Sequence, residues 1–240
     1  MRRLIGTSWK MNLTATAAEK YCATLRPLIA DITDRDLFIL PPYTSIHAVR
    51  GALHGTGVRW GAQHVHPDDR GAHTGDVSAP MLADLGCTLV EIGHSERRRD
   101  YGETDRLVAA QAASIQRWGM TALVCVGERE PDTLPAAMNA IRPQLAVLAD
   151  VDPARLIVAY EPVWAIGEGA RAAQPAWIGE IHRAIHDRLA TMHGDRRVPV
   201  IYGGSVDSGT AASILDRPGV DGLFVGRSAL DPVEFARIAH

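Results

Sequence analysis

The sequence has few cysteines, little net charge and no long hydrophobic run. Its three cysteines, Cys22, Cys87 and Cys125, are odd in number and far apart, so we expect no disulfide framework and a reducing, cytoplasmic location. The net charge of −3 gives no general attraction to nucleic acid or to an anionic membrane, and we expect neither as a partner. The first apolar stretch ends within a few residues, so we expect no signal peptide or membrane span.

What the chain does have is an ordinary globular composition. Its 240 residues are 46% hydrophobic and 22% charged, which argues against disorder. This length allows one large α/β or β domain, or two small domains. Because no linker or low-complexity tract divides the chain, we expect one domain over residues 1–240.

Eight short apolar segments recur along the chain, and segments with helical periodicity lie between them. Most are apolar on both faces, which is typical of parallel strands covered by helices. The pattern favours an α/β fold, a single (β/α)8 barrel. A doubly wound open sheet is the alternative, because alternation alone does not show closure. The expected strands are 4–9, 37–40, 58–63, 88–92, 121–126, 156–160, 198–201 and 222–225.

Capping signals mark several of the intervening helices. Thr16 and Glu19 have the spacing of a capping box, which predicts a helix start at Thr16. Apolar side chains recur at helical spacing over 104–118, and Gly119 follows as a typical stop. A second such stripe covers 177–189, and we expect this helix to end near Gly194.

Barrels place their chemistry at the carboxyl ends of the strands, so polar residues directly after an expected strand are the candidates. Lys10 follows the first strand, His94 the fourth and Glu161 the sixth. Lys10 is one of only two lysines among 25 basic residues, which indicates a need for a compact positive charge. Glu161 lies between an apolar strand and Pro162, where partial desolvation makes a carboxylate a stronger base. Each candidate also has an ordinary explanation when it is taken alone. Lys10 could be a solvated lysine, His94 a structural histidine, and the segment at Glu161 an ordinary surface loop.

Glycines mark the segments after the last three expected strands. The loop after Glu161 is restricted at Pro162, apolar in the middle and closed by Gly167-x-Gly169, which is typical of a lid. Glycine turns at 203–204 and 226 are typical of the phosphate site of a barrel.

A base, an imidazole, an ammonium, a lid and a phosphate site together favour proton abstraction beside a carbonyl in a small phosphorylated substrate. This chemistry needs no cofactor and no metal. His64-x-His66 is the nearest metal candidate, and its spacing to other ligands is poor.

Longer motifs of the sequence resemble the triosephosphate isomerase family, and the resemblance covers nearly the whole chain. The motifs occur in the family's order, which makes a chance match negligible. They are Trp9-Lys10-Met11-Asn12, Gly61-Ala62-Gln63, Thr74-Gly75, Gly93-His94-Ser95-Glu96-Arg97-Arg98, Tyr101-Gly102-Glu103-Thr104-Asp105, Cys125-Val126-Gly127-Glu128, Ala159-Tyr160-Glu161-Pro162-Val163-Trp164-Ala165-Ile166-Gly167 and Tyr202-Gly203-Gly204-Ser205-Val206.

The resemblance implies a role for each strand-end residue, as in triosephosphate isomerase itself. Glu161 is implied as the base that moves a proton between C1 and C2. His94 is implied as the neutral imidazole that polarises the carbonyl, and Lys10 as the cation that stabilises the enediolate. Glu96 is implied to support these residues without contacting the substrate itself.

The resemblance also implies substrate contacts, a lid and a homodimer. The dimer would insert the loop over 64–77 into the partner, with Thr74 near the partner's active site. The implied substrate contacts are Ser8, Lys10, Gly167, Ser205, Gly226 and Arg227, and the implied lid contains Pro162, Val163, Trp164, Ala165, Ile166 and Gly167.

Three residues depart from the family's pattern. Ser8 stands where the family has asparagine, two positions before Lys10. Arg227 replaces a second glycine after Gly226, and His73 replaces an aromatic residue in the dimer loop. These departures resemble a side branch that isomerises four-carbon ketose phosphates such as L-erythrulose 1-phosphate, because a serine leaves room for one more carbon.

Three functions therefore stay open. Isomerisation of glyceraldehyde 3-phosphate and dihydroxyacetone phosphate, in glycolysis and gluconeogenesis, is the family's default. Isomerisation of L-erythrulose 1-phosphate to D-erythrulose 4-phosphate is the alternative of the same class. A non-catalytic sugar-phosphate-binding protein is the alternative of another class, and the retention of Lys10, His94 and Glu161 argues against it.

Overall fold

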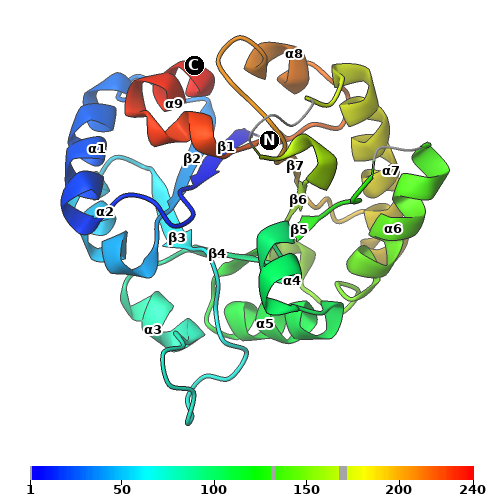
Figure 1. Cartoon of the computed structure of the whole chain (residues 1–240), viewed down its shortest axis with the longest axis horizontal. Helices are drawn as coiled ribbons and strands as arrows, with labels where there is room; N and C mark the ends of the chain where they lie inside the picture. Colours follow the sequence, from blue (N-terminus) through cyan, green and yellow to red (C-terminus); the bar gives the residue numbers. More distant parts are fainter. Residues whose placement is uncertain (1, 131–132, 168–171) are drawn as a thin grey trace.

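A computed structural model describes residues 2–130, 133–167 and 172–240 of the chain. In this part of the chain, eight parallel strands pair in chain order from β1 to β8, and β8 pairs with β1. The sheet is therefore a closed barrel, and the helices surround it (Figure 1). The expected (β/α)8 barrel is confirmed, and the open sheet is excluded.

The element bounds follow the sequence pattern closely. The strands are β1 Arg3–Ser8, β2 Arg35–Leu40, β3 Arg59–Ala62, β4 Leu89–Ile92, β5 Thr121–Val126, β6 Leu156–Tyr160, β7 Val200–Tyr202 and β8 Gly222–Val225. The helices are α1 Ala15–Leu28, α2 Ile46–Leu53, α3 Ala79–Asp84, α4 Ser95–Tyr101, α5 Asp105–Arg117, α6 Leu134–Ala146, α7 Pro175–His193, α8 Ala211–Leu215 and α9 Pro232–Ala239. Short 3-10 turns are η1 Tyr43–Ser45, η2 Pro153–Arg155, η3 Val163–Ala165 and η4 Arg227–Leu230.

The start of α1 differs from the expected capping box. Thr14 is the N-cap, and its side chain accepts a hydrogen bond from the Ala17 N–H at 3.4 Å. Thr16 lies inside the first turn of the helix instead. The reason is local, because Leu13 has a left-handed φ of 65° that turns the chain just before Thr14.

The stops expected from glycine are confirmed. Thr104 caps α5, and Gly119, with a φ of 76°, follows the end of the helix. Gly194, with a φ of 65°, ends α7.

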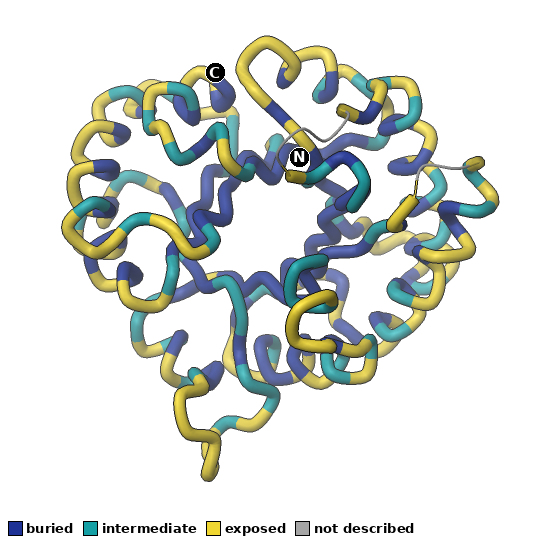
Figure 2. Tube along the Cα trace, in the orientation of Figure 1, coloured by how far each residue is buried: buried dark blue, intermediate teal, exposed yellow. Residues whose placement is uncertain are grey.

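Two apolar layers hold the barrel. The larger layer lies between the strands and the surrounding helices, and the smaller layer fills the barrel interior. Figure 2 shows the strands as a buried ring, with exposure concentrated on the outer helices and loops. Because side chains alternate along a strand, every second residue points inward. The interior layer contains Leu4, Phe38, Leu40, Leu89, Leu123, Cys125, Ile157, Ala159, Ile201 and Phe224.

Two further features concern the environment of the protein. None of the helices in the described ranges has the length and apolar character needed to cross a bilayer. Cys22, Cys87 and Cys125 are all buried free thiols.

Gly222 makes the closure between β1 and β8 possible. A Cβ at this position would lie 1.9 Å from the carbonyl oxygen of Leu4 on the neighbouring strand. Such a contact is far below any van der Waals distance, so the two strands could not keep their spacing.

We expect Gly222→Ala to lower the free energy of unfolding by more than about 2 kcal/mol, since overpacking must push β1 and β8 apart. Gly51→Ala is the matched control, because a Cβ at this position of α2 meets nothing within 4 Å. The control should gain about 0.5–1 kcal/mol from helix propensity. Urea unfolding measures both, and a Gly222→Ala protein as stable as the wild type would contradict the close approach.

Candidate active site

One cavity at the carboxyl ends of the strands gathers the side chains expected from the sequence. It has a volume of about 600 Å³. The expected catalytic residues Lys10, His94 and Glu161 line it. So do all the expected substrate contacts, namely Ser8, Lys10, Gly167, Ser205, Gly226 and Arg227.

Lys10 lies just after β1 in a strained backbone conformation. Its φ of 53° is left-handed, which is uncommon for a residue with a side chain. Gln63 holds this turn, because its Nε2 donates to the carbonyl oxygens of Lys10 at 3.0 Å and Leu40 at 2.9 Å. The Lys10 ammonium forms an ion pair with Glu96, with 2.6 Å between Nζ and Oε1. The expected support by Glu96 is thus a direct contact with Lys10.

His94 is fixed by the start of α4. It is the N-cap of this helix, and its Nδ1 accepts a hydrogen bond from the Glu96 N–H at 3.1 Å. A ring nitrogen that accepts cannot carry the proton, so the hydrogen bond assigns the proton of the neutral ring to Nε2. That nitrogen lies 3.4 Å from Oε1 of Glu161.

Glu161 follows β6 in a narrow slot. Its side chain is only 3% exposed, and Oε2 accepts a long hydrogen bond from the Ser95 N–H at 3.5 Å. Glycines make the space, because a Cβ at Gly203 would lie 2.9 Å from Cγ of Glu161. A Cβ at Gly127 would lie 1.8 Å from the Glu161 carbonyl oxygen. The missing side chains at Gly203 and Gly127 therefore leave space for Glu161, whose carboxylate faces His94.

The expected lid begins at Pro162 and is described as far as Gly167. The turn η3 is anchored to the segment after β5, because Trp164 Nε1 donates to Glu128 Oε1 at 2.8 Å. It is also anchored by the segment after β7, because Ser205 Oγ donates to the Ala165 carbonyl oxygen at 2.8 Å. The end of the expected lid, Glu168 and Gly169, lies outside the described residues.

Arg227 contacts the lid rather than leaving it free. Its guanidinium donates to the Gly167 carbonyl oxygen at 3.2 Å. This residue therefore lies where it borders both the cavity and the lid.

A second cavity of about 780 Å³ lies on the other side of Glu161. It is lined by Gly93, Arg98, Gly127 and Gln144 among others, and Glu161 borders both cavities. Lys10 and His94 line only the smaller cavity, so we place the chemistry there.

Glu91 is a buried acid that sequence reasoning missed. It points into the barrel from β4 and is 2% exposed. Ser8 Oγ donates to its Oε2 at 2.7 Å, and the Cys125 thiol lies 3.9 Å from its Oε1. Burial raises the pKa of Glu91 to about 7, although the nearby His94 and Lys10 oppose this shift. The only signal in the sequence is one acidic residue inside an otherwise apolar expected strand.

Two clusters bring potential metal ligands together in the described residues. One is Glu91, His94 and Glu161, whose ligand atoms lie within 4.8 Å of one another. In this cluster, His94 Nδ1 already accepts a hydrogen bond from the Glu96 N–H, and Glu91 Oε2 already accepts one from the Ser8 hydroxyl.

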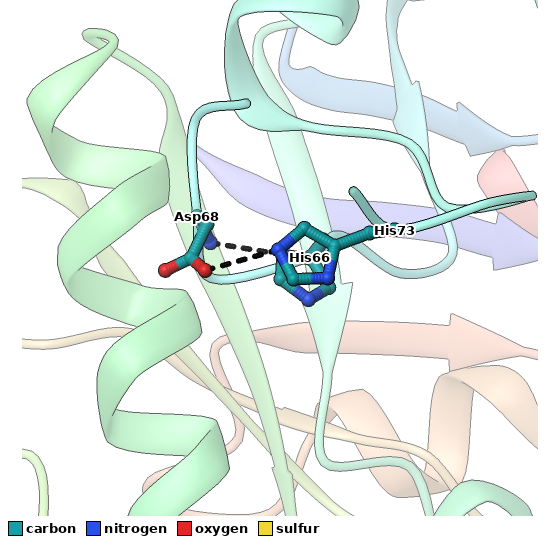
Figure 3. A group of neighbouring side chains, drawn as sticks. All are labelled: His66, Asp68 and His73. Carbon is teal, nitrogen blue, oxygen red and sulfur yellow. Dashed lines mark hydrogen bonds and ion pairs between the residues drawn. The ribbon is translucent and has the colours of Figure 1, made fainter. Parts of the chain in front are cut away.

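The other cluster is His66, Asp68 and His73 in the loop between β3 and α3 (Figure 3). The two imidazole rings stack at 3.9 Å between centroids, so their nitrogen lone pairs point side by side rather than at one ion. His66 Nδ1 accepts the Asp68 N–H, and His73 contacts the Asp68 carboxylate at 3.2 Å. These contacts brace the loop.

The structure does not bring Thr74 into the cavity. Thr74 is exposed in the loop between β3 and α3, which projects from the ring of helices (Figure 1). His73 is exposed in the same loop.

Comparisons with known proteins give matches over nearly the whole chain. The model of the triosephosphate isomerase family matches residues 3–240. A protein of Mesorhizobium japonicum named L-erythrulose-1-phosphate isomerase is 42% identical over 94% of this chain and 91% of its own length. The triosephosphate isomerase of Aquifex aeolicus is 37% identical over 100% of this chain and 99% of its own.

A solved structure shows the same fold. The crystal structure of triosephosphate isomerase from Bartonella henselae superposes with a TM-score of 0.88 and 32% identity. The match covers 99% of this chain and 98% of that chain.

The raised pKa of Glu91 predicts a pH-dependent stability. Because the folded protein binds this proton more tightly than the unfolded chain, the stabilisation is complete below the ordinary carboxyl pKa of 4.5 and is lost as the pH rises through about 7. Glu91→Gln removes the titration. Relative to the wild type, we expect the variant to gain about 2 kcal/mol between pH 5 and pH 8.

Urea unfolding of both proteins at the two pH values measures this gain. Glu19→Gln, an exposed position on α1, is the control and should show no such trend. A stability difference between Glu91→Gln and the wild type that stays constant with pH would contradict the shifted pKa.

Proposed function

The chain belongs to the triosephosphate isomerase family, and we propose that its smaller cavity moves a proton between adjacent carbons of a small phosphorylated sugar. The chain is an isomerase of this family, of the type that interconverts aldose and ketose phosphates. The observation that carries the assignment of the site is the 3.4 Å approach of His94 Nε2 to Glu161 Oε1, beside the ammonium of Lys10. A substrate seated there meets a base and a hydrogen-bond donor at adjacent atoms.

We propose Glu161 as the base. Its carboxylate takes the proton from the carbon next to the carbonyl, and the electrons of that C–H bond form an enediolate. The proton then returns to the neighbouring carbon, so the carbonyl moves by one position and no atom is gained or lost. The missing side chains at Gly203 and Gly127 give Glu161 the space that it occupies beside His94.

We propose His94 and Lys10 as the groups that stabilise the enediolate. The Nε2 proton assigned to His94 donates to a substrate oxygen, and the Lys10 ammonium supplies positive charge. The folded protein already holds the strained backbone turn at Lys10, so this turn does not have to form when substrate binds. Glu96 holds the ammonium in place until then.

The phosphate of the substrate has a separate proposed site. Gly167, Ser205 and Gly226 line the same cavity as the base, and Arg227 adds a positive charge there. We propose that closing the lid from Pro162 to Gly167 over this site excludes water and suppresses loss of phosphate from the enediolate. Arg227 links the two, because it already holds the Gly167 carbonyl.

We propose two candidate substrate classes for this site. Glyceraldehyde 3-phosphate and dihydroxyacetone phosphate are the default, and would place the enzyme in glycolysis and gluconeogenesis. A four-carbon ketose phosphate is the second candidate, and the short side chain of Ser8 in the cavity favours it. We propose the cytoplasm as the compartment, because all three cysteines are buried free thiols.

We also propose a homodimer. The support is the projecting loop between β3 and α3, which exposes Thr74 and is braced internally by His66, Asp68 and His73. A loop held in shape while it projects into solvent is suited to insert into a partner.

The base assignment predicts the effect of one substitution. Glu161→Gln keeps the shape of the side chain but removes the basic carboxylate, so kcat should fall at least about a thousandfold on triose and tetrose phosphates alike, with little change in KM. Steady-state assays on both substrate classes measure this. Glu19→Gln should match the wild type, and undiminished turnover by Glu161→Gln would show that another group is the base.

The dimer proposal predicts the effect of a charge at the loop. Light scattering should give twice the mass of one chain for the wild type, and Thr74→Arg should shift it to one chain with reduced activity, since a bulky cation cannot enter a fitted interface. Thr16→Arg, an exposed position on α1, is the control and should stay dimeric. A monomeric wild type, or a dimeric Thr74→Arg protein, would refute the insertion of this loop.

A further inference from the structure

Three titratable side chains share a buried space beside the smaller cavity. One carboxylate oxygen of Glu91, one of Glu161 and one ring nitrogen of His94 lie within 4.8 Å of one another, and all three residues are buried. His94 and Glu161 line this cavity, whereas Glu91 lines neither of the two cavities. Any effect of Glu91 on the reaction must therefore come from its charge and from the groups next to it.

The two carboxyls of this group have different surroundings. Glu161 faces two N–H groups, because His94 Nε2 lies 3.4 Å from its Oε1 and the Ser95 N–H donates to its Oε2 at 3.5 Å. It also borders both cavities. Glu91 receives one hydroxyl, from Ser8 at 2.7 Å, and a weak contact from the Cys125 thiol at 3.9 Å. Negative charge is therefore better supported at Glu161 than at Glu91.

A proton is the group that relieves the repulsion between these carboxyls. Within the described ranges, no lysine or arginine forms an ion pair with Glu91, and the Lys10 ammonium is already paired with Glu96. A metal ion is not a substitute, because His94 Nδ1 accepts a hydrogen bond and Nε2 then carries the proton, which leaves no lone pair for a metal. Two buried carboxylates this close together repel strongly, so one of them keeps a proton.

We propose that Glu91 is a positioning residue that stays neutral beside His94 and Glu161, and that it thereby limits this part of the site to one carboxylate charge, which an anionic substrate tolerates. This inference rests on the isomerase site proposed above. The proton lies on Glu91, because Glu161 has the better support for a negative charge. Burial raises the pKa of Glu91 to about 7, so Glu91 is mostly neutral below this pH and mostly charged above it.

Glu91 has charged or titratable neighbours on several elements. They are Lys10 after β1, His94, Glu96 and Arg98 at α4, Cys125 on β5 and Glu161 after β6. Burial raises the pKa of the Cys125 thiol well above its usual range, so this group stays neutral near pH 7. Because His94 and Glu161 are titratable too, a pH profile identifies Glu91 only when it is compared with a variant that lacks this acid.

Ionised Glu91 would act differently on substrate binding and on proton transfer. Its added negative charge repels a dianionic phosphate substrate, which weakens binding. The same charge raises the proton affinity of Glu161, which favours proton abstraction, but it opposes the negative charge that the enediolate oxygens acquire beside His94. The two influences on the chemical step oppose each other, so we expect the main effect on KM.

The first test compares KM and kcat from about pH 6.5 to about pH 9. Glu91→Gln keeps an oxygen that accepts from Ser8 but has no charge at any pH. The ratio of the wild-type KM to that of Glu91→Gln should rise at least about threefold over this range, with a smaller change in the ratio of kcat. Titration of the substrate phosphate is common to both proteins and cancels in the ratio. Glu19→Gln, an exposed position on α1, should follow the wild type.

A second variant tests the inference without removing the acid. The Ser8 hydroxyl stabilises ionised Glu91, so Ser8→Ala should raise the pKa of Glu91 and move the midpoint of the KM profile to higher pH. Ser205→Ala is the matched control, because this hydroxyl lines the same cavity but bonds the Ala165 carbonyl instead. It should change KM and leave the midpoint in place. Ser8→Ala decides alone if Glu91→Gln does not fold.

Sulfate binding separates this inference from the proposed function, because it needs no turnover. Sulfate is a dianion that does not titrate in this pH range. Its dissociation constant, measured by calorimetry, should rise with pH in the wild type relative to Glu91→Gln. If the wild type turns over sugar phosphates but the KM and sulfate profiles of Glu91→Gln match its own, the isomerase site stands and the inference is overturned.

Two other outcomes are equally decisive. An unchanged midpoint in Ser8→Ala would also overturn the inference, because a purely structural bond between Ser8 and Glu91 does not move with the charge of the acid. If the wild type turns over no triose or tetrose phosphate, the proposed function is refuted, and the sulfate profiles still decide whether Glu91 controls the charge of the site.

Discussion

Closure of the sheet between β1 and β8 is the constraint on which the rest of the structure depends. The pairing of Leu4 with Gly222 brings the first and last strands together, and with them the residues that follow each strand. Lys10, after β1, thereby shares one cavity with Arg227, after β8. An open sheet would leave these two at opposite edges. Closure also creates the interior that the hydrogen bond between Ser8 and Glu91 spans.

The charged side chains of this site are held in place by their partners and by the space that glycines leave. Lys10 is paired with Glu96, and Glu161 lies against His94. Each arrangement keeps a reactive group ready without leaving it isolated, because an unpaired buried charge is strongly unfavourable. Gly203 contributes by what it lacks, since a Cβ there would collide with Glu161. The site is thus organised around Glu161, above the apolar side chains that fill the barrel.

The sequence was sufficient for the barrel and for the strand-end residues, since both follow from local patterns. A strand followed by a polar residue is readable along the chain, and this placed Lys10, His94 and Glu161. Glu91 was missed because its partner Ser8 is distant in sequence and the two meet only across the barrel. The wrong helix start at Thr16 has a local cause. Thr14 and Thr16 can both cap a helix, and the left-handed turn at Leu13 selects Thr14.

Because the net charge of the protein is −3, an anionic ligand has to be attracted by positive side chains close to its site. A dianionic phosphate approaches an acidic molecule, and the described residues place Lys10 and Arg227 around the cavity that would receive it. In the proposed reaction, proton transfer moves a negative charge from Glu161 to oxygens of the substrate, toward Lys10 and the Nε2 proton of His94. Glu91 stays nearby as a group whose pKa is raised by burial and by Glu161. In that reaction, the loss of negative charge at Glu161 would lessen its repulsion with Glu91 as the enediolate forms, which makes the two neighbouring carboxyls compatible.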